Sequence, residues 1–249
     1  WEKAQRVGGQ IHLAVAAPDK TEVQPVWDYR WSQLMEMKVP VKCGVDADAA
    51  MIKAFKPDFV VVATGSVPRE APIDTSALAS DIAVMHAWDV FAAPERIAPG
   101  TSVTVIGGGM VGVEVADVLR LTGCDIQVLE MQATAANGMA RNNKFELLER
   151  IAAAGVRVIT QCRIESLSER HLTVKIGQAA STQLPVGQVL IFANGPRSNI
   201  DVVTAIEQVG IPYARVGDCH APGDFLSAIR DGWMVGLGID QQPFSGRTV

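Results

Sequence analysis

The clearest pattern of hydrophobic and polar positions lies in the middle of the chain. Residues 102–106 (SVTVI) form a short β-branched run that ends in glycines, residues 110–121 carry small and apolar residues at helical spacing, and residues 125–130 (DIQVLE) are predicted as a second strand. Gly123 is placed to end the helix. This order predicts two parallel strands joined by a crossover helix, and therefore an α/β fold.

The pattern continues on both sides of this strand–helix–strand unit. After it we expect a helix at 142–155, a strand at 156–160, an antiparallel meander at 163–188 and a buried strand at 189–195. Before it, residues 39–65 repeat the closing half of the same plan, because the strand ending in VATG matches the one ending in FANG. Further elements are predicted as helices at 21–37 and 224–239 and as a strand at 211–218.

The simplest organisation is two Rossmann-like nucleotide-binding domains, one inserted in the other. The inserted domain spans 101–208, the outer, discontinuous domain consists of 1–100 and 209–249, and a hinge is expected at 93–100 (APERIAPG). We expect the outer domain to lack its first strand and its phosphate loop in this sequence, because residue 2 is interpreted as the end of a second strand. Since such a sheet has unpaired edges, we expect this domain to be completed by another chain or segment, or to be less ordered than the insert.

A glycine motif follows the first central strand. Gly107, Gly109 and Gly112 satisfy G-x-G-x-x-G between a predicted strand and a predicted helix. These glycines permit a tight turn, close approach of backbone N–H groups to a pyrophosphate, and close helix packing, while Glu130 would accept hydrogen bonds from an adenosine ribose and repel a 2′-phosphate. The pattern favours NADH over NADPH. ADP or AMP alone, or a glycine turn that binds nothing, are the alternatives.

The start of the chain is interpreted by comparison with this unit. Glu2 stands at the end of a second strand, as the acidic residue of the central unit does, so that Gly9 and Gln10 would lie near the middle of a second dinucleotide. Gly217 and Asp218 follow the last predicted strand, where a carboxylate commonly receives a ribose or ribityl hydroxyl. Taken alone, Asp218 is also a good candidate for a helix N-cap.

Composition and charge argue against several classes of protein. The net charge of −5 over 249 residues and the scattered Lys and Arg residues give no basic surface for nucleic acid or an anionic membrane. No apolar run is long enough to span a bilayer and no signal-peptide pattern is present, so a cytoplasmic location is expected. The four cysteines form no C-x-x-C pair and no Cys/His spacing, which argues against a metal site and against a disulfide reductase.

Two further features leave alternatives open. Arg141 would lie either near the nucleotide or in a solvated loop. The aromatic residues Trp27, Tyr29 and Trp31 fall in a predicted helix, where one face of a core helix or a contact with a further domain is favoured over a ligand cage.

Five stretches carry a family resemblance: EKAQRVGGQ, VVVATGSVPR, VIGGGMVGVEVAD, FANGPRSN and GDCHAPGDFLSAIRDG. They resemble the flavoprotein half of the NADH:flavin oxidoreductase family of 2,4-dienoyl-CoA reductase, enoate reductase and trimethylamine dehydrogenase. The resemblance implies FAD, or in some members ADP, in the two nucleotide domains. It also implies an N-terminal flavin barrel, with FMN and an iron–sulfur cluster, that performs the substrate chemistry. Because this sequence contains no such barrel, no catalytic residue is assigned.

The resemblance also assigns residues to the two cofactors. It implies that Glu2 binds the FAD adenosine ribose, and that Gly217 and Asp218 form the ribityl contact. Beside the same dinucleotide it places Gly9, Gln10, Thr64 and Gly65. To the pyridine nucleotide it assigns Gly107, Gly109, Gly112 and Glu130, with Gly195 at the rim.

The sequence therefore predicts the FAD- and NADH-binding portion of a flavin-dependent oxidoreductase. Hydride would pass from NADH to the flavin, and electrons would continue to the flavin barrel or to a completing chain. The alternative is a non-catalytic module that holds ADP or NAD as a structural nucleotide. Activity of this chain by itself is left open.

Overall fold

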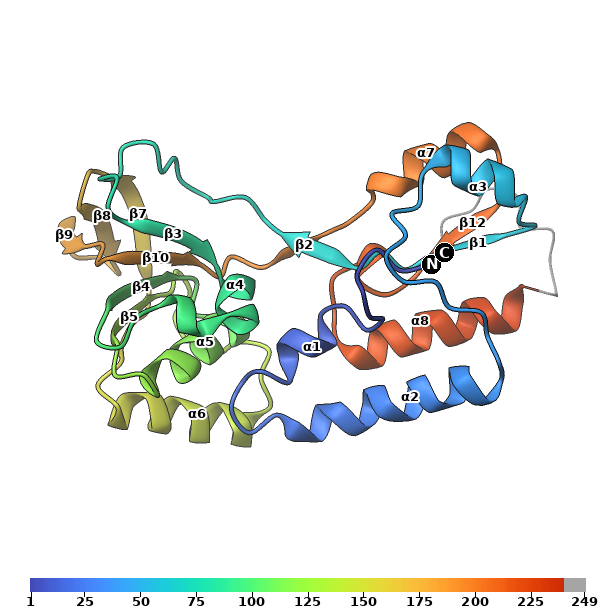
Figure 1. The fold of residues 1–249 in the computed structure, drawn as a ribbon. Coiled ribbons are helices and arrows are strands. Elements are labelled where there is room, and N and C mark those ends of the chain that lie inside the picture. Colours follow the sequence, from blue (N-terminus) through green and yellow to red (C-terminus); the bar gives the residue numbers. More distant parts are fainter. Residues whose placement is uncertain (240–249) are drawn as a thin grey trace. The chain divides into compact units, whose positions relative to one another are not determined.

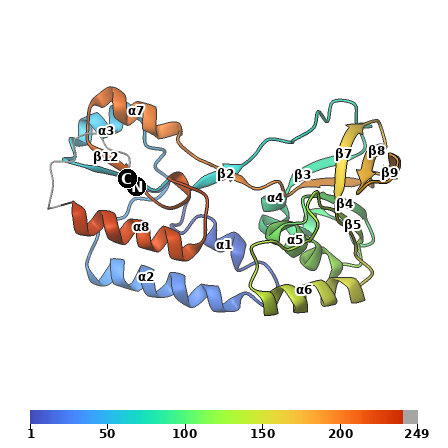
Figure 2. The same ribbon diagram turned by 180° about the vertical axis from the view of Figure 1, so that it is seen from behind.

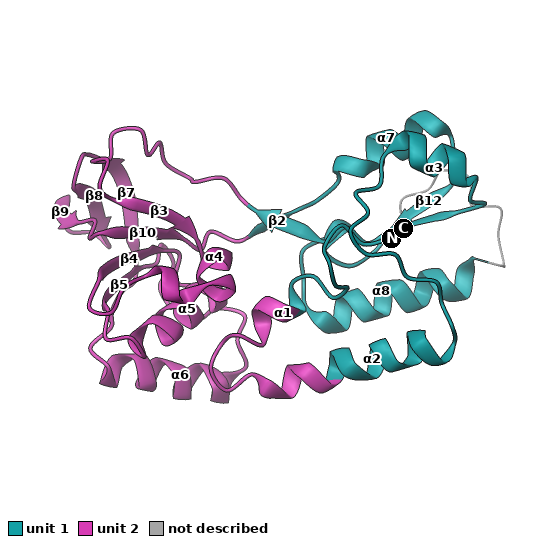
Figure 3. Cartoon of the chain, viewed as in Figure 1, with its two compact units in different colours: residues 1–11, 26–68, 196–249 teal, residues 12–25, 69–195 magenta. Residues whose placement is uncertain are grey.

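The computed structural model describes residues 1–239, which form two compact units (Figures 1 and 3). Unit 1 consists of Trp1–Ile11, Val26–Pro68 and the chain from Pro196 onward, and unit 2 consists of His12–Pro25 and Arg69–Gly195. These divisions fall at other positions than the domain boundaries expected at 100/101 and 208/209. The first difference arises because residues 69–100 contribute a strand and a helix to unit 2, and the second because residues 196–208 pair and pack within unit 1.

Unit 2 is built on a parallel sheet, which confirms the predicted α/β fold. Its strand order is β3-β10-β4-β5-β6, and every neighbouring pair is parallel. The strands are β3 (Ala83–His86), β10 (Val189–Phe192), β4 (Ser102–Ile106), β5 (Asp125–Leu129) and β6 (Arg157–Ile159). The sequence pattern did not predict β3, whose first two residues are exposed and carry no buried alternation.

Side chains of this sheet point alternately into two apolar clusters. Val103 and Val105 of β4 lie in a cluster with α4 (Ala87–Ala92), α5 (Met110–Arg120) and α6 (Arg141–Ala153). Leu190 and Phe192 of β10 lie in the other cluster, with strands β7 (Cys162–Leu167) and β8 (His171–Ile176). β8 also pairs with β9 (Thr182–Pro185), so the predicted antiparallel meander is confirmed (Figure 2). Both faces of the sheet are therefore covered, as parallel sheets require.

The hinge expected at 93–100 is wrong. This segment lies within unit 2, and part of it forms the short 3-10 helix η2 (Pro94–Arg96). Ile97 follows directly and is buried in the cluster beneath α4 and α5. Its proline and glycine residues therefore mark a turn within a packed unit.

Helices α5 and α6 are joined by a network of charges. Asp117 of α5 is buried, and it accepts hydrogen bonds from Arg120 Nε (2.5 Å) and from Arg150 Nε (2.9 Å) and Nη2 (2.6 Å). Arg150 also donates to Asp19, at 2.8 Å, and Lys20 pairs with the buried Glu114 of α5. These ion pairs hold the segment 12–25 on unit 2.

Unit 1 contains a smaller parallel pair, β1 (Val60–Val62) and β12 (Tyr213–Arg215). Val62 packs with α3 (Ala49–Phe55) and α7 (Asp201–Val209), while Ala214 packs with α8 (Phe225–Gly238) (Figure 1). Separately, β2 (Ser66–Pro68) pairs with β11 (Pro196–Ser198) in antiparallel fashion, and Glu2 forms a parallel bridge with Cys43. The interpretation of unit 1 as a Rossmann-like domain without its first strand stays a prediction.

The remaining elements are α1 (Ile11–Ala14), η1 (Thr21–Val23), α2 (Gln24–Glu36) and η3 (Gly217–Cys219). α2 contains no buried residue, so its aromatic side chains do not form the face of a core helix. Trp27 and Trp31 instead stack on each other, with ring centroids 5.7 Å apart. Among residues 1–239, no helix is long and apolar enough to cross a membrane.

The Asp117 network gives a pH-dependent prediction. Burial by itself raises the pKa of Asp117, but hydrogen bonds from Arg150 and Arg120 outweigh it and hold the pKa below the ordinary value of 3.8. A carboxyl group with a lowered pKa stabilises the fold above its unfolded pKa, and this stability is lost as pH falls through the folded value. We expect Asp117→Asn to lower the free energy of unfolding by about 1–3 kcal/mol at neutral pH.

Urea unfolding followed by circular dichroism at neutral pH and near pH 3 checks this prediction. The difference between variant and wild type should shrink at the lower pH. Asp81→Asn is the matched control, because the Asp81–Arg170 pair is exposed and should contribute little. An equal loss of stability at both pH values would contradict the electrostatic origin.

Candidate functional site

The predicted glycine motif forms the turn between β4 and α5. Gly107 has a φ of 102°, and a Cβ atom there would lie 2.5 Å from the carbonyl oxygen of Ala193. A Cβ atom at Gly112 would lie 1.8 Å from the carbonyl oxygen of Gly107, so helix and turn touch backbone to backbone. Gly109 differs, because an added Cβ would meet no atom within 4 Å. The first and third glycines are thus required by protein packing, and the second faces open space.

That open space lies at the N-terminus of α5. Gly109 is the N-cap residue, makes no side-chain cap, and is followed by a first turn without an acidic residue. The first N–H groups of a helix have no intrahelical partner and carry partial positive charge. An anionic group of a ligand therefore fits here, as at other glycine-rich helix starts.

Glu130 lies beside this turn, as predicted, but its carboxylate contacts protein. The side chain is 7% exposed. Its Oε2 accepts a hydrogen bond from Gly108 N at 2.7 Å, and its Oε1 accepts one from Gln132 N at 2.6 Å. A carboxylate has further lone pairs, so these bonds leave capacity for a ribose hydroxyl.

Gly195 lies at the same edge of the sheet. It comes three residues after β10, which pairs in parallel with β4, so both strands end at one edge. Gly195 has a φ of 83°, and its carbonyl accepts a hydrogen bond from Arg69 N at 3.1 Å. The five residues predicted for the pyridine nucleotide therefore all lie at the carboxyl edge of the unit 2 sheet.

In unit 1 the structure brings together two predicted residues, Gln10 and Asp218. Gln10 Nε2 donates to Asp218 Oδ2 at 3.1 Å and to Ser66 Oγ at 2.8 Å, and Ser66 Oγ donates to Asp218 Oδ2 at 2.7 Å. Asp218 Oδ1 accepts from Gly223 N at 3.0 Å. The result is a closed triangle of polar side chains, which we call the Gln10–Ser66–Asp218 triangle.

The neighbouring predicted residues support this triangle through the backbone. Thr64 Oγ1 donates to the carbonyl of Asn199 at 2.6 Å, and Gly65 has a φ of 68° and accepts a hydrogen bond from Asn199 N. Gly9 also has a positive φ, 52°. Gly217 N donates to Asp231 at 3.0 Å, which fixes the turn that carries the triangle's carboxylate.

One alternative for unit 1 differs from the structure. Asp218 is not the N-cap of α8, because Asp224 takes that position and accepts from Ser227 N at 2.8 Å. Glu2 forms the bridge with Cys43, and its carboxylate accepts a hydrogen bond from Ala4 N at 2.8 Å; its role at the adenosine ribose stays a prediction.

Sequence reasoning missed two residues of these sites. Ser66 directly follows the VATG stretch, and its polarity after a buried strand was the available signal. Gly108, the middle residue of GGG, lies outside the G-x-G-x-x-G positions. The role of Gly108 is evident only in the structure, where its N–H donates a hydrogen bond to Glu130.

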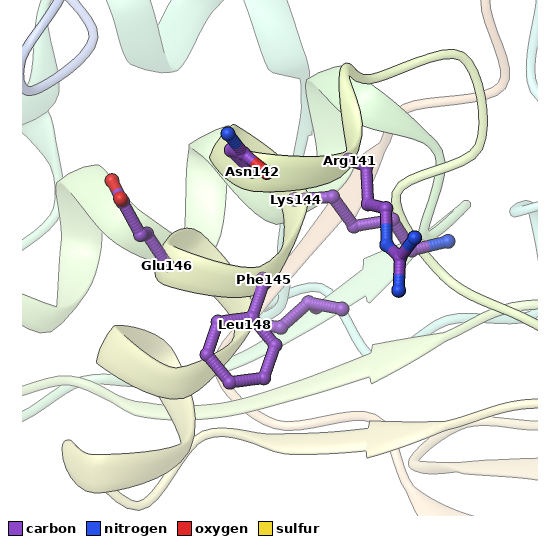
Figure 4. Close-up of a pocket in the computed structure, with 6 residues that line it drawn as sticks. All are labelled: Arg141, Asn142, Lys144, Phe145, Glu146 and Leu148. Atoms are coloured by element: carbon purple, nitrogen blue, oxygen red, sulfur yellow. The ribbon is translucent and has the colours of Figure 1, made fainter.

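Arg141 starts a helix and does not lie in a loop. It is the first residue of α6 and lines a surface hollow of about 430 Å³ with other residues of the same helix (Figure 4). The residues that line it are Arg141, Asn142, Lys144, Phe145, Glu146 and Leu148. Arg141 is exposed, and a position near the nucleotide stays open.

Comparison with known proteins identifies the class. The family described as pyridine nucleotide-disulphide oxidoreductase matches residues 33–220. The chain belongs to this family of oxidoreductases, and it is an FAD/NAD-binding domain of that kind. The predicted resemblance to the FAD/NAD-binding portion of the NADH:flavin oxidoreductase family is thereby confirmed.

The relatives are longer than this chain. It is 30% identical to an NADH oxidase of Thermoanaerobacter brockii and 31% identical to a bilirubin reductase of Mediterraneibacter gnavus, in each case over 94% of this chain and 36% of the relative. The fold is similar to that of a 2-naphthoyl-CoA reductase complex (TM-score 0.82, 21% identity, 94% of this chain, 35% of that one). It is also similar to the fold of histamine dehydrogenase from Rhizobium sp. 4-9, with a TM-score of 0.84 and 16% identity over 98% of this chain and 40% of that one. The chain spans about a third of the curated relatives it matches.

The contrast between two glycines of the turn gives a prediction. Gly109→Ala should fold and lose no more than about 1 kcal/mol of stability as a poorer N-cap, because the backbone there is extended and the space beside it is open. If a nucleotide phosphate occupies that space, the added methyl group should weaken NADH binding roughly tenfold. Titration of NADH fluorescence, with thermal unfolding of the same samples, measures both effects.

Gly112→Ala is the comparison variant, since its methyl group would collide with the carbonyl of Gly107. We expect this variant to lose both stability and NADH binding. Unchanged NADH affinity in Gly109→Ala would show that no ligand group approaches this turn.

Proposed function

We propose that the chain binds NADH at the glycine turn of unit 2 and FAD beside the Gln10–Ser66–Asp218 triangle of unit 1. It would serve as the part of a flavin-dependent oxidoreductase that accepts hydride from NADH. The observation that carries the proposal is the turn at Gly107–Gly112, whose first and third glycines are fixed by packing and whose second is open.

The chain's own groups would bind and orient the nucleotide. The free N–H groups at the start of α5 would hold the pyrophosphate, and Gly195 would border the site from the end of β10. The negative charge of Glu130 would disfavour a 2′-phosphate, which supports NADH over NADPH. When bound, NADH and FAD supply the hydride chemistry, and the protein supplies orientation and exclusion of water.

The flavin assignment is supported by the chemistry of the triangle. Asp218 accepts hydrogen bonds, Gln10 can donate and accept, and Ser66 can do both. Such a set suits the hydroxyl groups of a ribityl chain, the role that the family resemblance gives to Asp218. Gly9 and Gly65 allow backbone to approach the same ligand.

A further domain, or a completing chain, is part of this proposal. α8 exposes large apolar side chains, among them Leu226 (74%) and Trp233 (64%), and within the described residues β1 pairs with β12 alone. Apolar surface and an open parallel edge of this kind are normally covered. The greater length of the relatives is consistent with such a cover, and a flavin barrel with FMN and an iron–sulfur cluster would receive the electrons.

A disulfide reductase is the less favoured reading. The four cysteines are free thiols, and Cys124, Cys162 and Cys219 are buried. Burial raises the pKa of Cys162, which lowers its reactivity. The remaining alternative function is that of a non-catalytic module that binds ADP or NAD as a structural nucleotide.

Absorbance at 450 nm, with FAD supplied and NADH then added without oxygen, tests the proposed function. A yellow protein that bleaches with NADH is the expected result. Gln10→Ala should lose flavin absorbance because it opens the triangle, while its NADH affinity should be unchanged.

Gln208→Ala, an exposed glutamine of α7, is the matched control for this experiment and should keep the flavin. A colourless wild-type protein that still binds ADP or NADH would support the non-catalytic module instead. If neither flavin nor nucleotide binds, both functions are rejected.

A further inference from the structure

The buried carboxylate of Glu130 makes contacts that a ribose ligand alone would not need. It directly follows β5, is 7% exposed, and accepts a hydrogen bond from Gly108 N with one oxygen and from Gln132 N with the other. Hydrogen bonds from backbone N–H groups to a buried carboxylate are among the stronger ones in proteins. Glu130 therefore ties its own loop to the middle glycine of the turn.

Gly108 is held at both of its backbone polar groups. Its N–H donates to Glu130, and its carbonyl accepts a hydrogen bond from Ala136 N at 2.7 Å. The fit is close, because a Cβ atom at Gly108 would lie 2.8 Å from Cβ of Glu130. The loop after β5 and the glycine turn thus form one hydrogen-bonded unit.

This attachment fixes the path of the chain into α5. Gly107 N donates a hydrogen bond to Leu129 O, and Gly108 is bonded to Glu130 and Ala136. Gly109 is then the N-cap of α5, and no N-cap side chain accepts hydrogen bonds from the first N–H groups of the helix. If the bond to Gly108 is lost, the turn can rotate, and the anion-binding N–H groups lose their common direction. The carboxylate predicted to bind the ribose would therefore also influence the phosphate end of the site.

We propose that Glu130 is a positioning residue that holds the glycine turn in its phosphate-binding shape. This inference rests on the proposed nucleotide function and adds a role to the ribose contact predicted from sequence. It implies that Glu130 contributes to affinity mainly through the phosphates of a ligand. Phosphate-free adenosine should therefore depend on Glu130 less than ADP does, through the ribose contact alone.

Binding of ADP and of adenosine to Glu130→Gln, measured by equilibrium dialysis, tests this role. Glutamine offers one oxygen to two N–H donors and turns its amide group toward the second. We expect ADP affinity to fall roughly tenfold and adenosine affinity to fall clearly less. Glu130→Ala, which satisfies neither donor, should show the same selectivity more strongly. Glu149→Gln, an exposed site on α6, is the charge-matched control and should change neither affinity.

Amide hydrogen exchange provides a readout that does not depend on ligand. In Glu130→Ala the N–H groups of Gly108 and Gln132 should exchange much faster than in wild type, while those of the β4 and β5 strands keep their protection. A variant that is merely less stable would lose protection throughout unit 2.

The outcomes separate the two levels of inference. Equal losses for ADP and adenosine would make Glu130 a direct ribose ligand and overturn the positioning role, and so would unchanged exchange at Gly108. If wild type binds neither ligand, the proposed function fails. The exchange data would then still decide whether Glu130 holds the turn.

Discussion

At the turn between β4 and α5, the carbonyl of Gly107 lies so close to Gly112 that a single methyl group would not fit between them. This backbone contact sets the position of α5 on the sheet. The helix in turn carries Asp117 and Glu114, which attach α6 and the segment 12–25. Much of unit 2 is therefore arranged around a contact that leaves no room for a side chain.

The two units are stabilised in different ways. In unit 2 a parallel sheet is covered on both faces by extensive apolar clusters, and polar groups such as Gln127 are buried inside it. In unit 1 two small clusters flank a pair of short strands, and much of the order near the candidate flavin site comes from hydrogen bonds of Gln10, Ser66 and Asp218. The polar triangle therefore contributes structure as well as candidate chemistry.

Local patterns in the sequence were sufficient for elements that are regular and buried. The central strand–helix–strand unit, the meander and the positions of Gly107 and Gly112 could be predicted because alternation, helical spacing and glycine placement each have a direct physical cause. β3 was missed, since its position depends on pairing with β10, which is far away in sequence. Ser66 and Gly108 were missed because their partners come from other segments.

The same limit explains the errors. Proline and glycine at 93–100 signalled a break in regular structure, but sequence alone did not show that Ile97 is buried beside that break. Aspartate is a common N-cap residue, so Asp218 was a candidate cap, and only the fold showed that Asp224 is the N-cap of α8.

The ends of the long insertion in unit 1 have a consequence for how the chain assembles. Arg69 N donates to Gly195 O at 3.1 Å, so the first and last residues of this insertion are bonded to each other, and the flanking strands β2 and β11 are paired. Once residues 69–195 have folded, their two ends lie side by side, as the ends of a short loop would. The entropy cost of bringing the flanking strands β2 and β11 together has then already been overcome. Unit 1 can then form late in synthesis, without a search over the full sequence separation between Pro68 and Pro196.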